Sequence, residues 1–157
     1  MQRVTPFLWF NNQAEEAVNY YLSIFEDSRI LTKTRYGEVG PGPEGSIMSI
    51  DFELQGQAFV ALNGGPHFTF SEAVSFVVNC ETAEEVDHYW EKLSAGGEKS
   101  HCGWLKDQFG VSWQVVPTLL PRLIGDANQE KAQMVMAAML QMQKLDIVAL
   151  QTAYDDA

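Results

Sequence analysis

An internal repeat restricts the fold of this chain more than any other feature of its sequence. Residues 7–10 (FLWF) and 14–21 (AEEAVNYY) recur as residues 76–79 (FVVN) and 83–90 (AEEVDHYW), with the same spacing in both copies. Each copy starts with a short apolar run typical of a strand. It then carries apolar residues at helical spacing that end in an aromatic pair. The repeat therefore predicts two modules that begin alike, with a strand followed by a helix.

Each predicted helix has a recognisable start. Asn12 precedes Glu15 by three residues, and Thr82 precedes Glu85 by three residues. This spacing is a capping box, which satisfies free backbone amides in the first turn of a helix. We expect Asn12 and Thr82 to be the N-caps, and the Gly96-Gly97 pair to end the second helix.

The remaining segments complete the same order of elements in both halves. Three strand-like segments follow the first helix, at residues 28–36, 46–54 and 57–62. A tight Gln55-Gly56 turn precedes the third of them. The second half supplies strand-like segments at residues 73–79, near 98–101, and at 104–106 and 112–116. Each half is therefore βαβββ, which predicts an α+β fold and excludes a doubly wound parallel sheet.

Glycine and proline mark the boundaries of these modules. Residues 37–45 form a loop between two strands, and residues 63–66 (NGGP) form a linker. The expected organisation within one domain is a first module at 1–63, a second at 64–117 and a helical C-terminal extension at 118–157. Helical segments are expected at 117–125, 129–142 and 144–154. The second of them carries a stripe of Met, Ala and Leu side chains that would pack on the sheet or on a second subunit.

Composition excludes several classes of partner. The chain has 21 acidic and 10 basic residues and a net charge of -11, which repels nucleic-acid phosphates and anionic lipid. Its apolar runs are far shorter than the roughly 20 residues that span a bilayer. No leader pattern is visible, so we expect a cytoplasmic protein. The two cysteines, Cys80 and Cys102, form no CxxC pair and are expected to be reduced and mostly buried.

Two segments carry a resemblance to a known family. Residues 102–114 (CGWLKDQFGVSWQ) and the tail at 142–147 (MQKLDI), together with the AEEAVNYY helix start, resemble the PhnB-like branch of the glyoxalase/bleomycin-resistance (vicinal oxygen chelate) superfamily. That branch is also described as 3-demethylubiquinone-9 3-methyltransferase. The resemblance covers nearly the whole chain. It implies two βαβββ modules around a cupped cavity, a metal held by two side chains from each module, and a homodimer in which modules pair or swap.

The four metal-binding positions that the resemblance implies carry no suitable donor here. They fall within residues 4–7 (VTPF), 60–63 (VALN) and 73–76 (AVSF), and at Gln114. Divalent metals of this superfamily need His, Glu or Asp ligands. We therefore predict no bound metal. No glycine-rich nucleotide-binding turn is present either, so no other cofactor is predicted and the methyltransferase description gains no support from the sequence.

Strand alternation predicts which side chains would line the cavity. Thr5, Phe7 and Trp9 would face it from the first module, with Leu8 and Phe10 packed behind. In the second module, Ser75, Val77, Ser112, Gln114 and Val116 would face it, with Trp113 and Val115 behind. The candidate ligand-binding residues are Thr5, Phe7, Trp9, His67, Ser75, Trp104, Ser112 and Gln114. The Gln114 amide would bond a neighbouring side chain, a water molecule or the ligand itself.

The titratable residues point to no defined catalytic group. His67 is either a solvated loop residue or a donor or base at the cavity mouth, and His88 is expected to be exposed. His101 and Cys102 are adjacent strand residues with opposite directions, which argues against a Cys–His nucleophile pair.

Three carboxylates are candidates for a functional or structural role. Asp51 and Glu53 would share one face, either as paired acid/base groups or as solvated surface. Asp107 is interpreted as a structural residue of the turn that it opens. No catalytic residue is assigned from the sequence.

These observations favour one function and leave two alternatives. The favoured function is the binding of a small aromatic or amphipathic molecule in a metal-free, largely apolar cavity. The first alternative is a metal-dependent lyase, isomerase or dioxygenase of the same superfamily. The second is a resistance protein that sequesters a drug.

Overall fold

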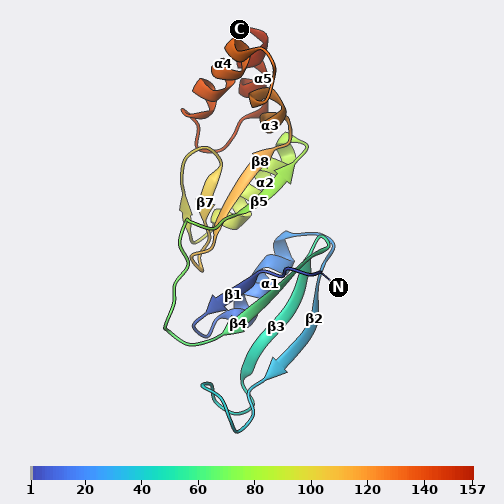
Figure 1. Ribbon diagram of the computed structural model, residues 1–157, viewed down its shortest axis with the longest axis vertical. Helices are drawn as coiled ribbons and strands as arrows, with labels where there is room; N and C mark the ends of the chain where they lie inside the picture. Colours follow the sequence, from blue (N-terminus) through green and yellow to red (C-terminus); the bar gives the residue numbers. More distant parts are fainter. Residues whose placement is uncertain (1) are drawn as a thin grey trace. The chain divides into compact units, whose positions relative to one another are not determined.

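The computed structural model describes residues 2–157 and divides into two compact units, one ending at Phe70 and one beginning at Ser71 (Figure 1). Both units contain a four-stranded sheet and a helix in the predicted βαβββ order. The α+β fold with two equivalent modules and a helical C-terminal extension is therefore confirmed.

The first unit contains the sheet order β1-β4-β3-β2. Its elements are β1 (Phe7–Phe10), α1 (Ala14–Ile24), β2 (Ser28–Arg35), β3 (Ile47–Leu54) and β4 (Gln57–Asn63). β1 pairs with β4 in parallel, and the other pairs are antiparallel. Helix α1 packs against β3 and β4, and its Tyr21 ring stacks on Phe52, with centroids 6.5 Å apart. The first core therefore lies between one helix and one face of one sheet.

The second unit repeats this arrangement in the order β5-β8-β7-β6. Its elements are β5 (Phe76–Cys80), α2 (Ala83–Ser94), β6 (Glu98–Lys99), β7 (Trp104–Lys106) and β8 (Ser112–Pro117). β5 and β8 are parallel, as β1 and β4 are in the first unit. Val86, Trp90 and Leu93 of α2 are buried, and the helix packs on β7 and β8.

The C-terminal extension has a hydrophobic cluster of its own. Helices α3 (Leu119–Ile124), α4 (Gln129–Met139) and α5 (Ile147–Asp155) enclose the buried residues Leu120, Leu123, Val135, Leu145 and Leu150. Val116 also belongs to this cluster, so the prediction that it faces the ligand cavity is wrong. The chain turns into α3 just after Val116, and the side chain is buried by the helices rather than left on the sheet surface.

The two predicted helix starts have different outcomes. Thr82 caps α2 as expected, because its Oγ1 accepts a hydrogen bond from Glu85 N at 3.2 Å. The prediction for Asn12 is wrong, since Gln13 is the N-cap of α1 and its side chain makes no capping bond. Instead Ala14 N donates to Asn63 Oδ1 at 2.8 Å. A residue distant in sequence supplies the group that a local cap would provide.

Several helices and strands also begin or end at residues other than those predicted. β5 begins at Phe76 rather than at residue 73, because its parallel pairing starts where Phe76 lies opposite Trp113. Pro117 is the last residue of β8, so α3 starts two residues later than predicted. α4 ends at Met139, and α5 starts only after Asp146, whose Oδ1 accepts from Ala149 N at 3.0 Å. β2 and β6 end earlier than predicted, at Arg35 and Lys99.

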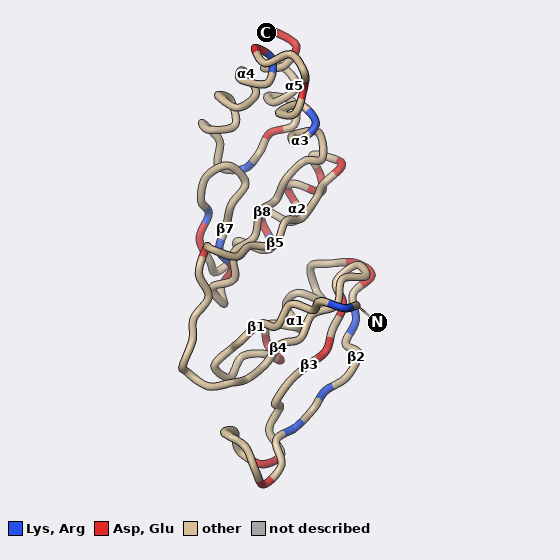
Figure 2. Tube along the Cα trace, in the orientation of Figure 1, with Lys and Arg blue, Asp and Glu red and all other residues tan. Residues whose placement is uncertain are grey.

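Charged side chains are unevenly distributed over these elements. Acidic and basic residues occur in both units, and three of the basic ones, Arg29, Lys33 and Arg35, follow one another along β2 (Figure 2). Lys33 pairs with Glu15 of α1, and Arg29 pairs with Glu53 of β3. Exposed ion pairs of this kind contribute little to stability. The core, and not this surface, therefore holds the unit together.

Asp107 organises the hairpin between β7 and β8. Its side chain is only 2% exposed. Oδ1 accepts from Phe109 N at 2.8 Å and Val111 N at 3.0 Å, and Oδ2 accepts from Trp113 Nε1 at 2.9 Å. Buried carboxylates require such donors, and donors left without an acceptor are costly. The structural role predicted for this aspartate is confirmed.

Replacing this carboxylate tests its contribution. We expect Asp107→Ala to lower the free energy of unfolding by roughly 3 kcal/mol, because three buried donors lose their acceptor. Urea unfolding followed by tryptophan fluorescence measures the change. Gln108→Ala, in the same turn but exposed, is the matched control and should change stability little. Equal losses in the two variants would contradict the assigned role.

Candidate functional site

Each sheet has one face covered by its own helix and one face turned away from it, which we call the helix-free face. On the first sheet, Phe7 lies on the helix-free face and is 61% exposed, while Trp9 is half-buried. Leu8 and Phe10 alternate with them and are buried on the helix side. Thr5 precedes β1 and is half-buried. Two of the three candidate residues of the first module thus belong to one surface.

The helix-free face of the second sheet brings together four candidate residues. Gln114 Nε2 donates to Ser75 Oγ at 2.9 Å. Trp104 lies opposite Gln114 on β7, and Val77 lies opposite it on β5. Ser112 lies two residues before Gln114 on the same face. The Gln114 amide therefore has a neighbouring side chain as its partner.

A cavity of about 530 Å³ opens on this part of the second unit. It is lined by Glu72, Glu98, Ser100, His101, Cys102, Trp104, Leu105, Lys106 and Ser112. Ser112 is 2% exposed, and its hydroxyl is the one buried side-chain polar atom in residues 2–157 that has no hydrogen-bond partner. An unpaired buried hydroxyl is unfavourable. The wall of this cavity therefore includes a residue whose buried hydroxyl has no partner among residues 2–157.

An ion pair lies at the border of the same cavity. Lys106 of β7 bonds to the carboxylate of Glu72. This hydrogen bond raises the pKa of Lys106 and lowers the pKa of Glu72, so both groups are charged at neutral pH. Both side chains are partly exposed. The cavity thus combines an indole surface, a neutral hydroxyl and a charged edge.

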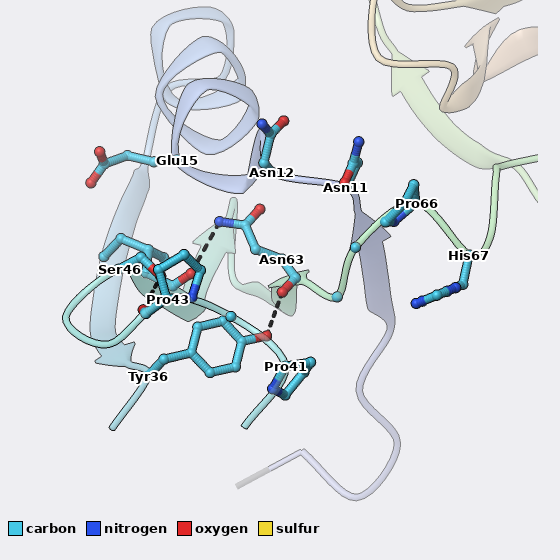
Figure 3. A pocket seen from close by; sticks show the side chains of 14 residues that line it. Asn11, Asn12, Glu15, Tyr36, Pro41, Pro43, Ser46, Asn63, Pro66 and His67 are labelled. Carbon is cyan, nitrogen blue, oxygen red and sulfur yellow. Dashed lines mark hydrogen bonds between the residues drawn. The ribbon is translucent and has the colours of Figure 1, made fainter. Parts of the chain in front are cut away.

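His67 belongs to a different cavity, of about 560 Å³, in the first unit (Figure 3). The β2–β3 loop and the segment after β4 form its walls, with Tyr36 and Asn63 between them. His67 is exposed in this segment. The sequence did not single out Tyr36 or Asn63, although the glycine- and proline-rich stretches that follow them were visible as a loop and a linker.

The two cysteines differ in accessibility. Cys80 is fully buried, and this burial raises the pKa of its thiol to about 12. Cys102 is half-buried, lines the cavity of the second unit, and donates through Sγ to Met139 O at 3.6 Å. That bond runs to the C-terminal extension and not to His101. His101 and Cys102 lie in the turn between β6 and β7 and not on a strand, so the predicted strand alternation does not apply to them.

The donors required for a divalent metal do not come together. Residues 2–157 contain no group of three or more His, Cys, Asp or Glu side chains that could hold an ion. Asp51 and Glu53 share the helix-free face of the first sheet, but Glu53 pairs with Arg29 at 3.1 Å. At Gln114 the available donors are an amide and the Ser75 hydroxyl. This donor set does not fit the metal site that the fold family implies.

No helix within residues 2–157 is long and apolar enough to cross a membrane.

Comparison with known proteins identifies a family. The sequence profile of the family described as 3-demethylubiquinone-9 3-methyltransferase matches residues 2–116. The structure of a putative 3-demethylubiquinone-9 3-methyltransferase, the PhnB protein of Bacillus cereus, is 40% identical to this chain, with a TM-score of 0.69. The match covers 74% of this chain and 100% of that protein. Among curated protein sequences, none matches significantly.

Two more distant structures share the fold. Protein PA1353 of Pseudomonas aeruginosa is 20% identical, with a TM-score of 0.63, over 74% of this chain and 98% of its own. The fosfomycin resistance protein FosX of Listeria monocytogenes, solved with Mn(II) and sulfate, is 15% identical, with a TM-score of 0.54. That match covers 78% of this chain and 94% of FosX. At these identities the likeness extends to the glyoxalase-type fold alone.

The difference between the cysteines can be measured directly. With iodoacetamide at mildly alkaline pH, we expect Cys102 to be alkylated well before Cys80, because only a thiolate reacts and the high pKa of buried Cys80 keeps it protonated. Peptide mass spectrometry of the folded protein over time measures both rates. Both residues should react at similar rates in denaturant. Comparable rates in the folded protein would show that Cys80 is not protected.

Proposed function

Because this chain belongs to the 3-demethylubiquinone-9 3-methyltransferase (PhnB-like) family, we propose that it binds a small amphipathic organic molecule on the helix-free face of its second sheet, without a protein-bound metal. The observation that carries this proposal is the unpartnered hydroxyl of Ser112 in a cavity beside Trp104. An unsatisfied buried hydroxyl costs about 1–3 kcal/mol. A ligand that bonds to it would recover part of that energy.

The other lining groups indicate the character of the ligand. The Trp104 indole is half-buried and offers a flat apolar surface to an aromatic ring or alkyl chain. Ser75 and Gln114 lie along one side of it, and the Lys106–Glu72 pair provides charge at the border. A molecule with an apolar body and a polar end matches this division.

The absence of suitable donors supports binding without a protein-held metal. The Gln114–Ser75 pair is neutral, and no cluster of metal-binding side chains occurs in the described part of the chain. FosX was solved with Mn(II), but its likeness to this chain concerns the fold. No residue of this chain is assigned a proton-transfer or nucleophilic role. A homodimer and a cytoplasmic location remain part of the same proposal.

The probe 8-anilinonaphthalene-1-sulfonate, which is aromatic and amphipathic, tests this site. We expect saturable fluorescence enhancement with the purified protein, and about tenfold weaker binding by Trp104→Ala, because the indole surface is lost. Phe68→Ala, which removes an exposed aromatic side chain from the first unit, is the matched control. Equal weakening in both variants, or no saturable binding, would refute the proposed site.

Metal content is measured on the same preparation. We expect far less than one manganese or zinc ion per chain by elemental analysis, and unchanged probe binding after dialysis against EDTA. Stoichiometric metal, together with lyase, isomerase or dioxygenase turnover, would instead support the enzyme alternative.

Ser112 provides a separate test of the unpaired hydroxyl. We expect Ser112→Ala to raise the free energy of unfolding by about 1 kcal/mol, because the substitution removes a buried hydroxyl that lacks a partner. Ser94→Ala is the matched control, since its buried hydroxyl donates to Trp90 O at 2.6 Å and its removal should not stabilise the protein. Urea unfolding measures both changes. A clear loss of stability in Ser112→Ala would contradict the assignment.

A further inference from the structure

The cavity of the first unit, around Tyr36 and Asn63, has no role in the proposed function. It lies entirely within the first unit, and none of its lining residues belongs to the second sheet. We propose that it is a separate binding site for a small uncharged molecule with an amide-type hydrogen-bonding edge, of the kind that uracil and adenine rings present. Four features of the cavity carry this inference.

The first feature is the fixed position of Asn63 between the walls. Its Oδ1 accepts from Ala14 N at 2.8 Å, and its Nδ2 donates to Ile47 O at 3.2 Å. Its backbone oxygen accepts from the Tyr36 hydroxyl at 2.5 Å (Figure 3). One residue thus joins the start of α1, the start of β3 and the end of β2. These bonds form the frame of the cavity before any ligand is present.

The second feature is the close packing of both walls on aromatic rings. A Cβ at Gly42 would lie 2.2 Å from the Tyr36 ring, so only glycine allows the β2–β3 loop to pack there. A Cβ at Gly64 would lie 2.4 Å from the Trp9 ring. Trp9 Nε1 also donates to Gly65 O at 2.9 Å. A preformed cavity binds more tightly because less ordering accompanies binding.

The third feature is a pair of free carboxamides. Asn11 and Asn12 project from the segment between β1 and α1 (Figure 3) and line the cavity. Their side chains make no hydrogen bond to other residues in the described range, 2–157. A carboxamide offers a donor and an acceptor side by side, as nucleobase and amide edges do. Two such groups favour a ligand of complementary pattern.

The fourth feature is the charge and shape of the lining. It contains no Lys or Arg, and its one carboxylate, Glu15, is bonded to Lys33 at 2.8 Å, which lowers the pKa of Glu15. The net charge of -11 also disfavours anions over the chain as a whole. Flat side chains contribute to the walls, namely Tyr36, Pro41, Pro43, Pro66 and His67. An uncharged ring fits these surroundings.

Titration with uracil and with adenine tests the proposal. We expect one of the two to shift amide signals of the full-length ¹⁵N-labelled protein at Gly42, Gly64 and Gly65, with a Kd of about 1 mM or tighter. Asn12→Ala should weaken this binding about tenfold, because a donor–acceptor pair is lost. Asn11→Ala is the second variant and should weaken it as well. Benzoate, a ring of similar size that carries negative charge, should not produce these shifts.

Gln13→Ala is the matched control. Gln13 is an exposed carboxamide next to Asn12, makes no capping bond and does not line the cavity. Its replacement should leave binding unchanged. The proposal is overturned if neither base shifts these signals, if the shifts fall in the second unit, or if benzoate binds equally well. It is also overturned if Asn11→Ala and Asn12→Ala both bind like the unaltered protein. Trp104→Ala should retain base binding, which separates this test from that of the second-sheet site.

Discussion

Each module has a single helix for a sheet that has two faces, and this constraint leaves one face of each sheet without a helix of its own. Helix α1 buries one face of the first sheet, with Tyr21 against Phe52, and α2 does the same in the second unit through Trp90 and Leu93. The opposite faces carry side chains such as the exposed Phe7 and the half-buried Trp104. A fold of this type therefore exposes one face of each sheet without needing extra structure.

The helix-free face of the second sheet carries neutral polar side chains. Gln114 and Ser75 bond to each other, and Ser112 keeps a hydroxyl that no described residue satisfies. The sheet is nevertheless well fixed, because Asp107 holds the adjoining turn through two backbone amides and the Trp113 indole. Rigid support beneath neutral polar groups suits recognition of an organic molecule more than coordination of a hard cation.

Much of the fold could be predicted because its signals are local. The bounds of β1 and β7 follow from apolar runs between turn residues, and the cap at Thr82 needs only the Glu85 that follows three residues later. The cap of α1 could not be predicted in this way. Asn12 has the correct spacing, but Asn63 supplies the bond from the end of β4. Local patterns cannot indicate when a distant side chain competes successfully for the same donor.

The sequence alone determined the repeated βαβββ order, the family and the lack of metal donors at the expected positions, because each depends on residue type and spacing. Only the tertiary structure decided that Gln114 pairs with Ser75, that Val116 is buried by the C-terminal helices, and that Tyr36 and Asn63 frame a cavity in the first unit. These outcomes depend on contacts between residues far apart in the chain. Their geometry is set by how strands pair and loops close, which residue spacing does not specify.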